Sequence, residues 1–494
     1  MQPGSQAPPH RATPDASVLD TSASVLDGAL LDAAVRLLDD FTEAGKADPD
    51  PGVPVLAHLV AEVCGPAAER ESGAAASAPG AARGPGPARD SSGARDFSGA
   101  CGSGRALGSG AVPGRGGIPG SRAAAASAGR AVAAWARTIG RGPGHCGLYD
   151  GGLAGTLVGL RLGARIHPPL HRAADRLRDH LLDKAWERPW RTADVGLPDY
   201  DLISGPSGTL LALCVGTAQP KRSQLMPYTA HLTELCDSGD LRRLHIGQYS
   251  GHPRLGRLRG RVNTGMGHGV AGLVTALTAA VRHVGPWPEM LDALRCATRW
   301  LVRQSFDDAR SVRSWDGAGL DGPPPAGVRA RQAWCYGNPG VTWALWDAAD
   351  ALGDRSLADW ALEAFGTLAE RYDEDVHLFG DPLTDRLGLC HGAAGVLVVA
   401  DAFHRHARLP AAGPLGARLA EHLGRELPAA LARAALGAPA PGAPTSGVSG
   451  ASASGVFAPG EARSLLVGVP GALSALLTAA HDAPRDWLGC LGLR

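Results

Sequence analysis

Two cysteines and one histidine in this chain have the types and surroundings of metal ligands. Cys335 stands in Trp-Cys-Tyr-Gly, and 55 residues later Cys390 and His391 stand in Leu-Cys-His-Gly. Thiolate and imidazole groups are typical zinc ligands, and three of them around a tetrahedral ion leave one position open. Structural zinc sites use all four positions, so the sequence predicts a catalytic zinc site with one ion per chain.

Each of these residue sets precedes a pair of glycines spaced Gly-x-x-Gly and a short apolar run. The arrangement recurs along the chain, and its instances begin at Gly152, Gly205, Gly269, Gly337, Gly392 and Gly468. Glycine permits a tight turn at the start of a helix. A run that is apolar all round predicts a helix buried on every side. Amphipathic segments between the units predict outer helices, and they include 170–187, 290–304 and 357–371.

An alternation of inner and outer helices that recurs in this way predicts an all-α fold. We expect the units to close into an α/α toroid of six to seven inner helices, with all the glycine starts at one end. A linear helical solenoid is the structural alternative. It does not explain why reactive residue types gather at the glycine starts.

Further reactive side chains stand just ahead of the glycine pairs in neighbouring units. They are Asp201, His268, Arg331 and Tyr336. A toroid would bring these places together around one cavity, so we expect them to line an active site. Structural roles are the alternative: a lone Cys or His is commonly a core residue, Asp201 can complement a helix dipole, and the other two can serve packing. His145 and Cys146, which precede the first unit, are expected to be structural, with a place in a substrate channel as the alternative.

The composition limits the partners and the compartment. The chain has 494 residues, of which 44% are apolar, enough for a large core. Lys and Arg together number 48, as do Asp and Glu, so nucleic acid is not expected as a partner. The nine cysteines show no disulfide pattern, and neither a signal peptide nor an apolar run of about 18 residues is evident. We therefore expect a cytoplasmic protein.

The chain divides into three parts by composition. Residues 1–64 are expected to form an N-terminal segment whose helices, over 24–44 and 54–64, pack on the toroid. The stretch that follows consists mainly of Gly, Ala, Ser, Pro and Arg. It can bury too little apolar surface to offset the entropy of ordering, so we predict a flexible insertion over 65–122. The toroid domain then occupies residues 123–494.

Together, these motifs resemble those of the lanthionine synthetase C-like cyclases. The matching motifs are Trp-Cys-Tyr-Gly, Cys-His-Gly, Asn-x-Gly-Met-x-His-Gly and Asp-Leu-Ile-x-Gly, within about residues 123–477. One departure is Gly267, where the family commonly has Ala. The resemblance implies an α/α toroid and zinc ligands at Cys335, Cys390 and His391. The other active-site positions that it implies are His268, Asp201, Arg331 and Tyr336.

The resemblance also implies a reaction, in which a peptide Cys thiol adds to dehydroalanine or dehydrobutyrine to form a thioether ring. His268 would protonate the resulting enolate, and Asp201 would orient a histidine or accept the thiol proton. Arg331 and Tyr336 would stabilise the enolate oxygen. The implied partners are a dehydrated precursor peptide, a lanthipeptide dehydratase and export machinery, which would make the protein peripheral to a membrane-associated complex.

Other functions are compatible with the same residues. A glutathione-adding relative would use the same zinc–thiolate chemistry on a different acceptor. A zinc prenyltransferase shares the toroid, but typically has an Asp among its ligands and a partner subunit. An inactive peptide-binding scaffold is the non-enzymatic alternative, and the intact ligand residues argue against it.

Overall fold

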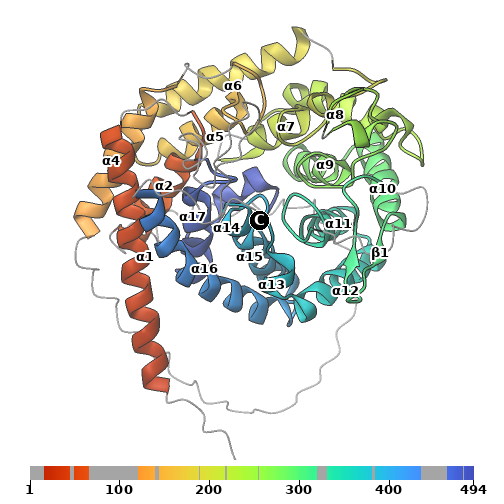
Figure 1. Ribbon diagram of the computed structural model, residues 1–494. Helices are drawn as coiled ribbons and strands as arrows, with labels where there is room; N and C mark the ends of the chain where they lie inside the picture. Colours follow the sequence, from red (N-terminus) through yellow and green to blue (C-terminus); the bar gives the residue numbers. More distant parts are fainter. Residues whose placement is uncertain are drawn as a thin grey trace, which may run out of the picture.

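Helices in two concentric layers form the body of the described structure (Figure 1). The computed structural model describes residues 16–44, 49–65, 121–139, 144–187, 190–216, 220–253, 255–319, 331–380, 384–435, 464–481 and 483–494. Within these ranges, no helix combines the length and apolarity that a membrane span requires.

The inner layer consists of short helices that are almost completely buried. They are α2 (Gly52–Cys64), α5 (Leu153–Gly163), α7 (Pro206–Cys214), α9 (Val270–Val284), α11 (Asn338–Leu352), α15 (Ala393–Ala402) and α17 (Val469–Ala480). Small and aliphatic residues allow close packing on all sides, and every residue of α7 is buried. Each inner helix packs against the next, and α17 packs against α2. The layer thus closes on itself, which confirms the predicted all-α toroid.

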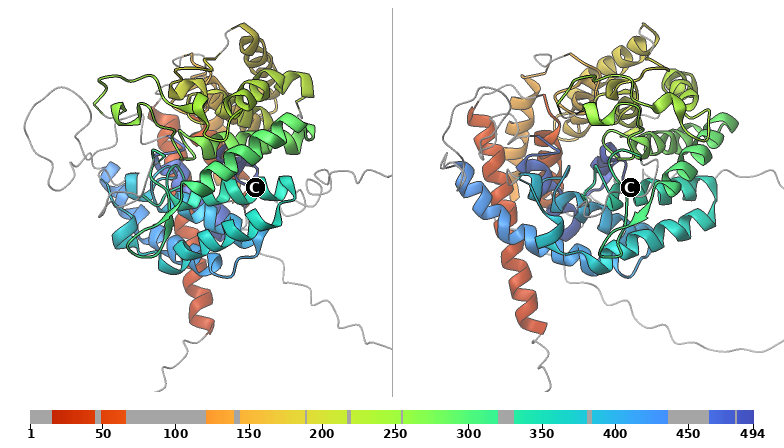
Figure 2. Two further views of the ribbon diagram at one scale, coloured as in Figure 1. Left: turned by 90° about the vertical axis from the view of Figure 1, so that its right-hand side faces the viewer. Right: turned by 45° about the vertical axis from the view of Figure 1, so that its right-hand side comes forward.

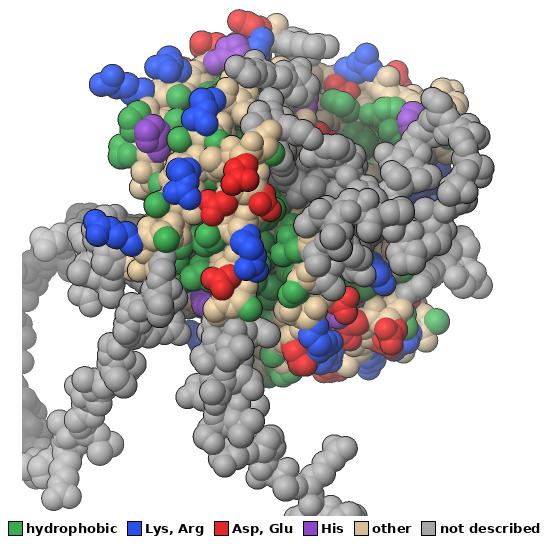
Figure 3. All heavy atoms as spheres, turned by 60° about the vertical axis from the view of Figure 1, so that its left-hand side comes forward, with side chains coloured by type: hydrophobic (Ala, Val, Ile, Leu, Met, Phe, Trp, Pro, Cys, Tyr) green, Lys and Arg blue, Asp and Glu red, His purple; other side chains and the backbone are tan. Residues whose placement is uncertain are grey.

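The outer layer consists of longer, amphipathic helices. They are α1 (Ala16–Ala44), α4 (Ser121–Ala136), α6 (Leu170–Glu187), α8 (Arg222–Leu235), α10 (Pro288–Arg303), α12 (Arg355–Arg371) and α16 (Ala412–Ala435). The predicted outer helices correspond to α6, α10 and α12. One end of α1 extends beyond the body of the ring (Figure 2). On the face shown in Figure 3, acidic and basic side chains are interspersed, in keeping with the balanced charge of the chain.

Short elements lie in the connections between these helices. They are η1 (Leu197–Asp199), η2 (Arg242–Leu244), η3 (Gly256–Leu258), β1 (Phe306–Asp307), β2 (Arg313–Ser314), α13 (Glu374–His377), α14 (Thr384–Leu387), η4 (Phe403–Ala407) and η6 (Asp486–Leu491). Strand β1 pairs antiparallel with β2, with Phe306 opposite Ser314. An antiparallel bridge between Asn263 and Ala318 joins the connection from α8 to α9 to the one that follows α10.

Helix α2 is the seventh inner helix of the described chain, beside the six that begin at glycine pairs. It lacks the pair, because Val55 stands three residues after Gly52. The buried carboxylate of Asp50 anchors its start. Oδ1 of Asp50 accepts hydrogen bonds from the amides of Gly52 (2.9 Å) and Leu465 (2.7 Å), so it joins α2 to the loop before α17. The predicted insertion over 65–122 lies almost wholly outside the described residues.

The C-terminal segment, residues 483–494, fills the centre of the ring (Figure 1). Its large side chains are buried, as Trp487 and Leu491 show with no exposed surface. Side chains of the inner units donate hydrogen bonds to its backbone carbonyls: Tyr149 to Cys490 (2.8 Å), Trp334 to Leu491 (3.0 Å) and Trp343 to Gly492 (2.8 Å). The segment is therefore a plug that stabilises the barrel from within.

Replacing Gly492 with Ala is expected to destabilise this plug. Gly492 has φ 71° and ψ 24°, and an added Cβ would lie 2.1 Å from Cγ2 of Thr275. Gly353 is the matched control, because it has φ 68° and ψ 22° but open space around it. The left-handed conformation costs either alanine about 1 kcal/mol. The clash adds about 1–3 kcal/mol at Gly492 alone. Chemical denaturation measures both, and equal losses would contradict the tight packing.

Candidate metal centre

Backbone hydrogen bonds join the loops that precede the inner helices into one continuous mouth. In each bond, an amide of one loop donates to a carbonyl of the next unit: Leu148 to Ile203 (3.0 Å), Leu202 to Gly267 (3.0 Å), Met266 to Cys335 (2.8 Å), Cys335 to Cys390 (3.3 Å) and Cys390 to Leu466 (2.8 Å). Both cysteines predicted to bind metal belong to this series. The fold thus fixes their backbone positions before any ligand binds.

The second glycine of a pair lets each inner helix approach its own loop. A Cβ at Gly340 would lie 2.0 Å from the carbonyl oxygen of Trp334. A Cβ at Gly395 would lie 2.0 Å from that of Leu389. Both distances are far shorter than van der Waals contact, so no larger residue fits. Because Cys335 and Cys390 directly follow these carbonyls, the glycines also set the place of the thiols.

Cys335, Cys390 and His391 come together at this mouth. Their two sulfur atoms and one imidazole nitrogen all lie within 4.8 Å of one another, and Sγ of Cys390 is 3.7 Å from Nε2 of His391. Ligands of a tetrahedral zinc ion, at bond lengths of about 2.0–2.3 Å, stand about 3.5–3.8 Å apart. The donor set therefore fits zinc in both type and spacing. In the part of the chain that the structure describes, this is the one such group.

The pKa values of the two thiols are shifted in opposite directions. Burial raises the pKa of the Cys335 thiol well above its usual value, and the hydrogen bond with Cys390 raises it further. The same hydrogen bond lowers the pKa of the Cys390 thiol, and His391 and His268 lower it as well. Cys390 is therefore the thiol that ionises first, and Cys335 is its hydrogen-bond donor.

A buried carboxylate holds a histidine beside the cluster. Nδ1 of His268 lies 2.5 Å from Oδ2 of Asp201, whose side chain has no exposed surface. The other carboxylate oxygen, Oδ1, accepts hydrogen bonds from the amides of Ser204 and Gly205 at 2.8 Å each. These bonds fix Asp201, which in turn orients the imidazole. Nε2 of His268 is then the nitrogen available for proton transfer, on a side chain that is 34% exposed.

The pKa of His268 is raised above its ordinary value by this pairing. Burial acts to lower the pKa, but the hydrogen bond and the charge of Asp201 outweigh it. The charges of Cys390 and Asp150 act in the same direction as Asp201. An imidazole that holds its proton near neutral pH is suited to act as an acid.

Tyr336 and Arg331, the other predicted site residues, have partners of their own. The Tyr336 hydroxyl accepts a hydrogen bond from Nδ2 of Asn263 at 3.0 Å, and burial raises its pKa, so it stays neutral. Nη1 of Arg331 donates to the carbonyl oxygen of Phe379 at 3.1 Å, and its guanidinium lies 4.4 Å from the centre of that ring. Arg331 is also close enough to lower the pKa of Cys335. Its role at an enolate oxygen stays a prediction.

Asp150 is a residue near the site that the sequence reasoning passed over. Burial raises the pKa of its carboxyl group, while its interaction with His268 lowers it, and Cys390 raises it. Its backbone is left-handed, with φ 56°. The signal in the sequence is its position, two residues before a glycine pair, which is the place that Cys335 and Cys390 hold in their own units.

Comparison with known proteins decides the family. A family model described as "Lanthionine synthetase C-like protein" matches residues 129–412, more than half of the chain. The chain belongs to the lanthionine synthetase C-like family. Among solved structures, nisin cyclase is similar, with a TM-score of 0.61 and 16% identity over 94% of this chain and 97% of that chain. At this identity the likeness shows a shared fold alone. A search of curated proteins produced no match.

Replacing Asp201 with Asn is expected to lower the pKa of His268. The substitution keeps the size of the side chain but removes the charge that opposes the effect of burial. NMR titration of the imidazole checks this, and an unchanged pKa in the variant would contradict the pairing.

The same pair predicts a pH dependence of stability. Because the folded-state pKa of His268 is raised, the pair stabilises the wild-type fold fully below the unfolded value of about 6.5. This stabilisation is lost as the pH rises through the folded-state value. Denaturation of wild type and Asp201→Asn across this window should therefore show a difference that shrinks with rising pH; a difference that grows would contradict the sign.

Proposed function

We propose that this protein is a zinc-dependent lanthipeptide cyclase, which adds a peptide Cys thiol to dehydroalanine or dehydrobutyrine. The observation that carries the proposal is the cluster of Cys335, Cys390 and His391 at the same mouth as the His268–Asp201 pair. A soft ligand set and a proton donor are what this addition requires. Family membership and the toroidal fold support the same reaction class.

Cys335, Cys390 and His391 would hold one zinc ion and leave its fourth position to the substrate. When bound, zinc supplies a Lewis acid that keeps a thiol in its ionised, nucleophilic form at neutral pH. Soft thiolate ligands favour zinc over the hard cations. The burial of Cys335 limits the access of water to this side of the site.

The chain's own residues supply the proton transfer. As the substrate sulfur bonds to the β-carbon of the dehydro residue, the electron pair of the double bond moves toward the carbonyl and leaves an enolate. His268 would deliver a proton from Nε2 to the α-carbon, while Asp201 keeps the ring oriented through Nδ1. The proton that the incoming thiol releases balances the one that His268 gives up. Tyr336 and Arg331 would donate hydrogen bonds to the enolate oxygen.

The substrate would be a dehydrated precursor peptide, in which a dehydratase has already removed water from Ser or Thr. Both reacting residues then belong to one molecule. Holding them at one mouth makes the addition effectively unimolecular, which can lower the barrier by about 7–11 kcal/mol.

Replacing Cys390 with Ala is expected to abolish stoichiometric zinc binding. Cys214 offers the matched control, because it is a buried cysteine on the inner helix α7 and stands outside the cluster. Metal analysis of the purified proteins should give about one zinc per chain in wild type and in Cys214→Ala. One zinc per chain in Cys390→Ala would show that the ligand assignment is wrong.

Replacing His268 with Ala is expected to leave zinc bound but to lower the cyclisation rate about 10²–10⁴-fold, since a general acid is lost. His171→Ala, at an exposed position on α6, is the control. The assay follows the loss of alkylatable thiols in a dehydrated precursor without a change in mass. A gain in mass with added glutathione would favour the glutathione-adding alternative, and full activity in His268→Ala would refute the role of the acid.

A further inference from the structure

An unusually basic segment borders the mouth. Residues 241–261, here called the arginine segment, lie between α8 and α9 and contain six arginines but no Asp or Glu. Arg257, Arg259 and Arg261 are exposed, and no carboxylate among the described residues pairs with them. Arg242 and Arg243, at the start of the segment, pair with Asp240 and Asp237, which leaves the positive charge at its other end. Unpaired arginines at adjacent places attract carboxylates, which they bind in bidentate geometry.

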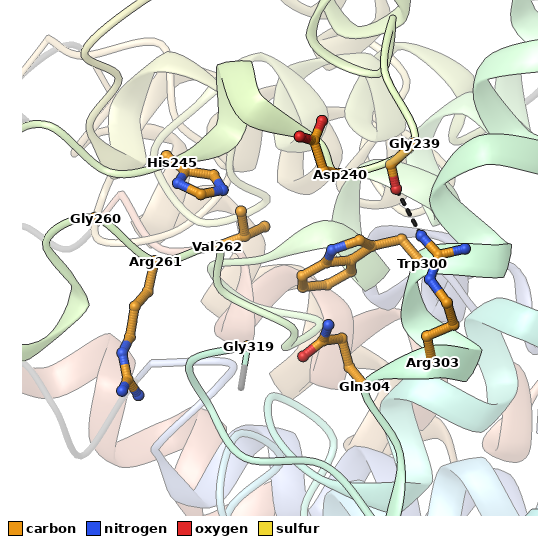
Figure 4. A pocket seen from close by; sticks show the side chains of 10 residues that line it. All are labelled: Gly239, Asp240, His245, Gly260, Arg261, Val262, Trp300, Arg303, Gln304 and Gly319. Carbon is orange, nitrogen blue, oxygen red and sulfur yellow. Dashed lines mark hydrogen bonds between the residues drawn. The ribbon is translucent and has the colours of Figure 1, made fainter. Parts of the chain in front are cut away.

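A pocket of about 450 Å³ opens beside the arginine segment (Figure 4). Its volume falls in the range of about 300–1,000 Å³ that is typical of ligand sites. Trp300 of α10 and Val262 supply apolar lining. His245 and Arg261 supply polar groups, and the carboxylate of Asp240, which also lines the pocket, is paired with Arg242. The pocket can thus take an apolar group with an oxygen acceptor beside it.

The indole nitrogen of Trp300 is an unused donor in this pocket. Trp300 is 6% exposed, yet its Nε1 has no hydrogen-bond partner among the described residues. Figure 4 shows the nitrogen on the side of the ring that faces His245 and Asp240. Solvent in the pocket reaches this nitrogen, so its N–H can bond either to water or to a ligand. A ligand that supplies a carbonyl or carboxylate oxygen would satisfy it.

Two short paired segments, residues 262–263 and 318–319, lie between the pocket and the candidate metal centre. Gly319 donates from its amide to the carbonyl oxygen of Val262 at 2.6 Å, and Asn263 pairs with Ala318. Successive residues of an extended segment face opposite sides. Val262 accordingly lines the pocket, whereas Asn263 bonds to Tyr336, the neighbour of Cys335.

The arginine segment is close to the same place. Arg261 directly precedes Val262, and Asn263, the next residue, donates from Nδ2 to the hydroxyl of Tyr336 at 3.0 Å. The basic surface, the pocket and the metal centre are therefore parts of one region. A peptide in extended conformation, at about 3.3 Å per residue, could contact all three.

We propose that the arginine segment and the pocket beside it dock an acidic segment of the peptide substrate. Carboxylates of the peptide would pair with Arg257, Arg259 and Arg261, and a peptide oxygen would accept the N–H of Trp300. The proposal rests on the proposed function for the identity of the peptide. The preference for acidic residues rests on the charges alone.

The test uses the full-length protein and two fluorescein-labelled probes, a glutamate-rich peptide and its glutamine counterpart. Fluorescence anisotropy should show that the glutamate peptide binds more tightly and loses affinity in high salt. The double variant Arg259→Glu/Arg261→Glu should bind it at least about tenfold more weakly. The matched control is Arg172→Glu/Arg176→Glu, which makes the same charge change at exposed positions on α6, and it should bind as wild type does.

Equal affinity for the two peptides, or equal effects of the two double variants, would overturn the proposal. Tighter binding of a single-stranded RNA probe than of the glutamate peptide would overturn the choice of a peptide. Zinc content and cyclisation of a dehydrated peptide without acidic residues are measured on the same variants and should be unchanged. If wild type binds the glutamate peptide through these arginines but cyclises nothing, the proposed function fails and the docking surface stands; if it cyclises without this binding, the reverse holds.

Discussion

The hydrogen bond from the amide of Cys335 to the carbonyl of Cys390 ties together two loops that are distant in the sequence. It is one link of a series that runs from loop to loop around the mouth of the toroid. Each loop precedes a buried inner helix, so the packed helices hold the loops in place. The hydrogen bonds between the loops then fix the distances between the side chains of the site. The candidate metal ligands, the His268–Asp201 pair and the hydroxyl of Tyr336 all depend on that spacing. A flexible mouth would have to order these groups on binding, at a cost in entropy.

Most of the toroid could be predicted, because its inner helices carry a steric requirement that is visible in the sequence. The glycine pairs mark places where a helix approaches a carbonyl within the distance that a Cβ would occupy. Helix α2 could not be found in this way, since Asp50 anchors it by a side chain instead of a glycine contact. The C-terminal plug carries no pattern either. Its backbone carbonyls accept hydrogen bonds from the side chains of Tyr149, Trp334 and Trp343. The residue types in 483–494 do not predict these partners, because every residue has a carbonyl.

The candidate site also contains residues that the sequence predicts and contacts that it does not. Cys335, Cys390, His391 and the histidine and carboxylate beside them could be predicted, because each stands at a glycine start and has a chemically distinctive side chain. The partner of Tyr336 could not, because an Asn is common and its hydrogen bond joins two separate units. The contact of Arg331 with Phe379 was equally hidden, since it crosses 48 residues and involves a backbone oxygen. Hydrogen bonds between common residue types that are distant in the sequence could not be predicted.

X-ray absorption at the zinc edge, with and without a Cys-containing dehydrated peptide, tests the central claim most directly. The account predicts two sulfur ligands at about 2.3 Å in the free protein and a third when the peptide thiol occupies the open position. A sulfur count that stays at two, or a free protein with four protein ligands around zinc, would contradict it.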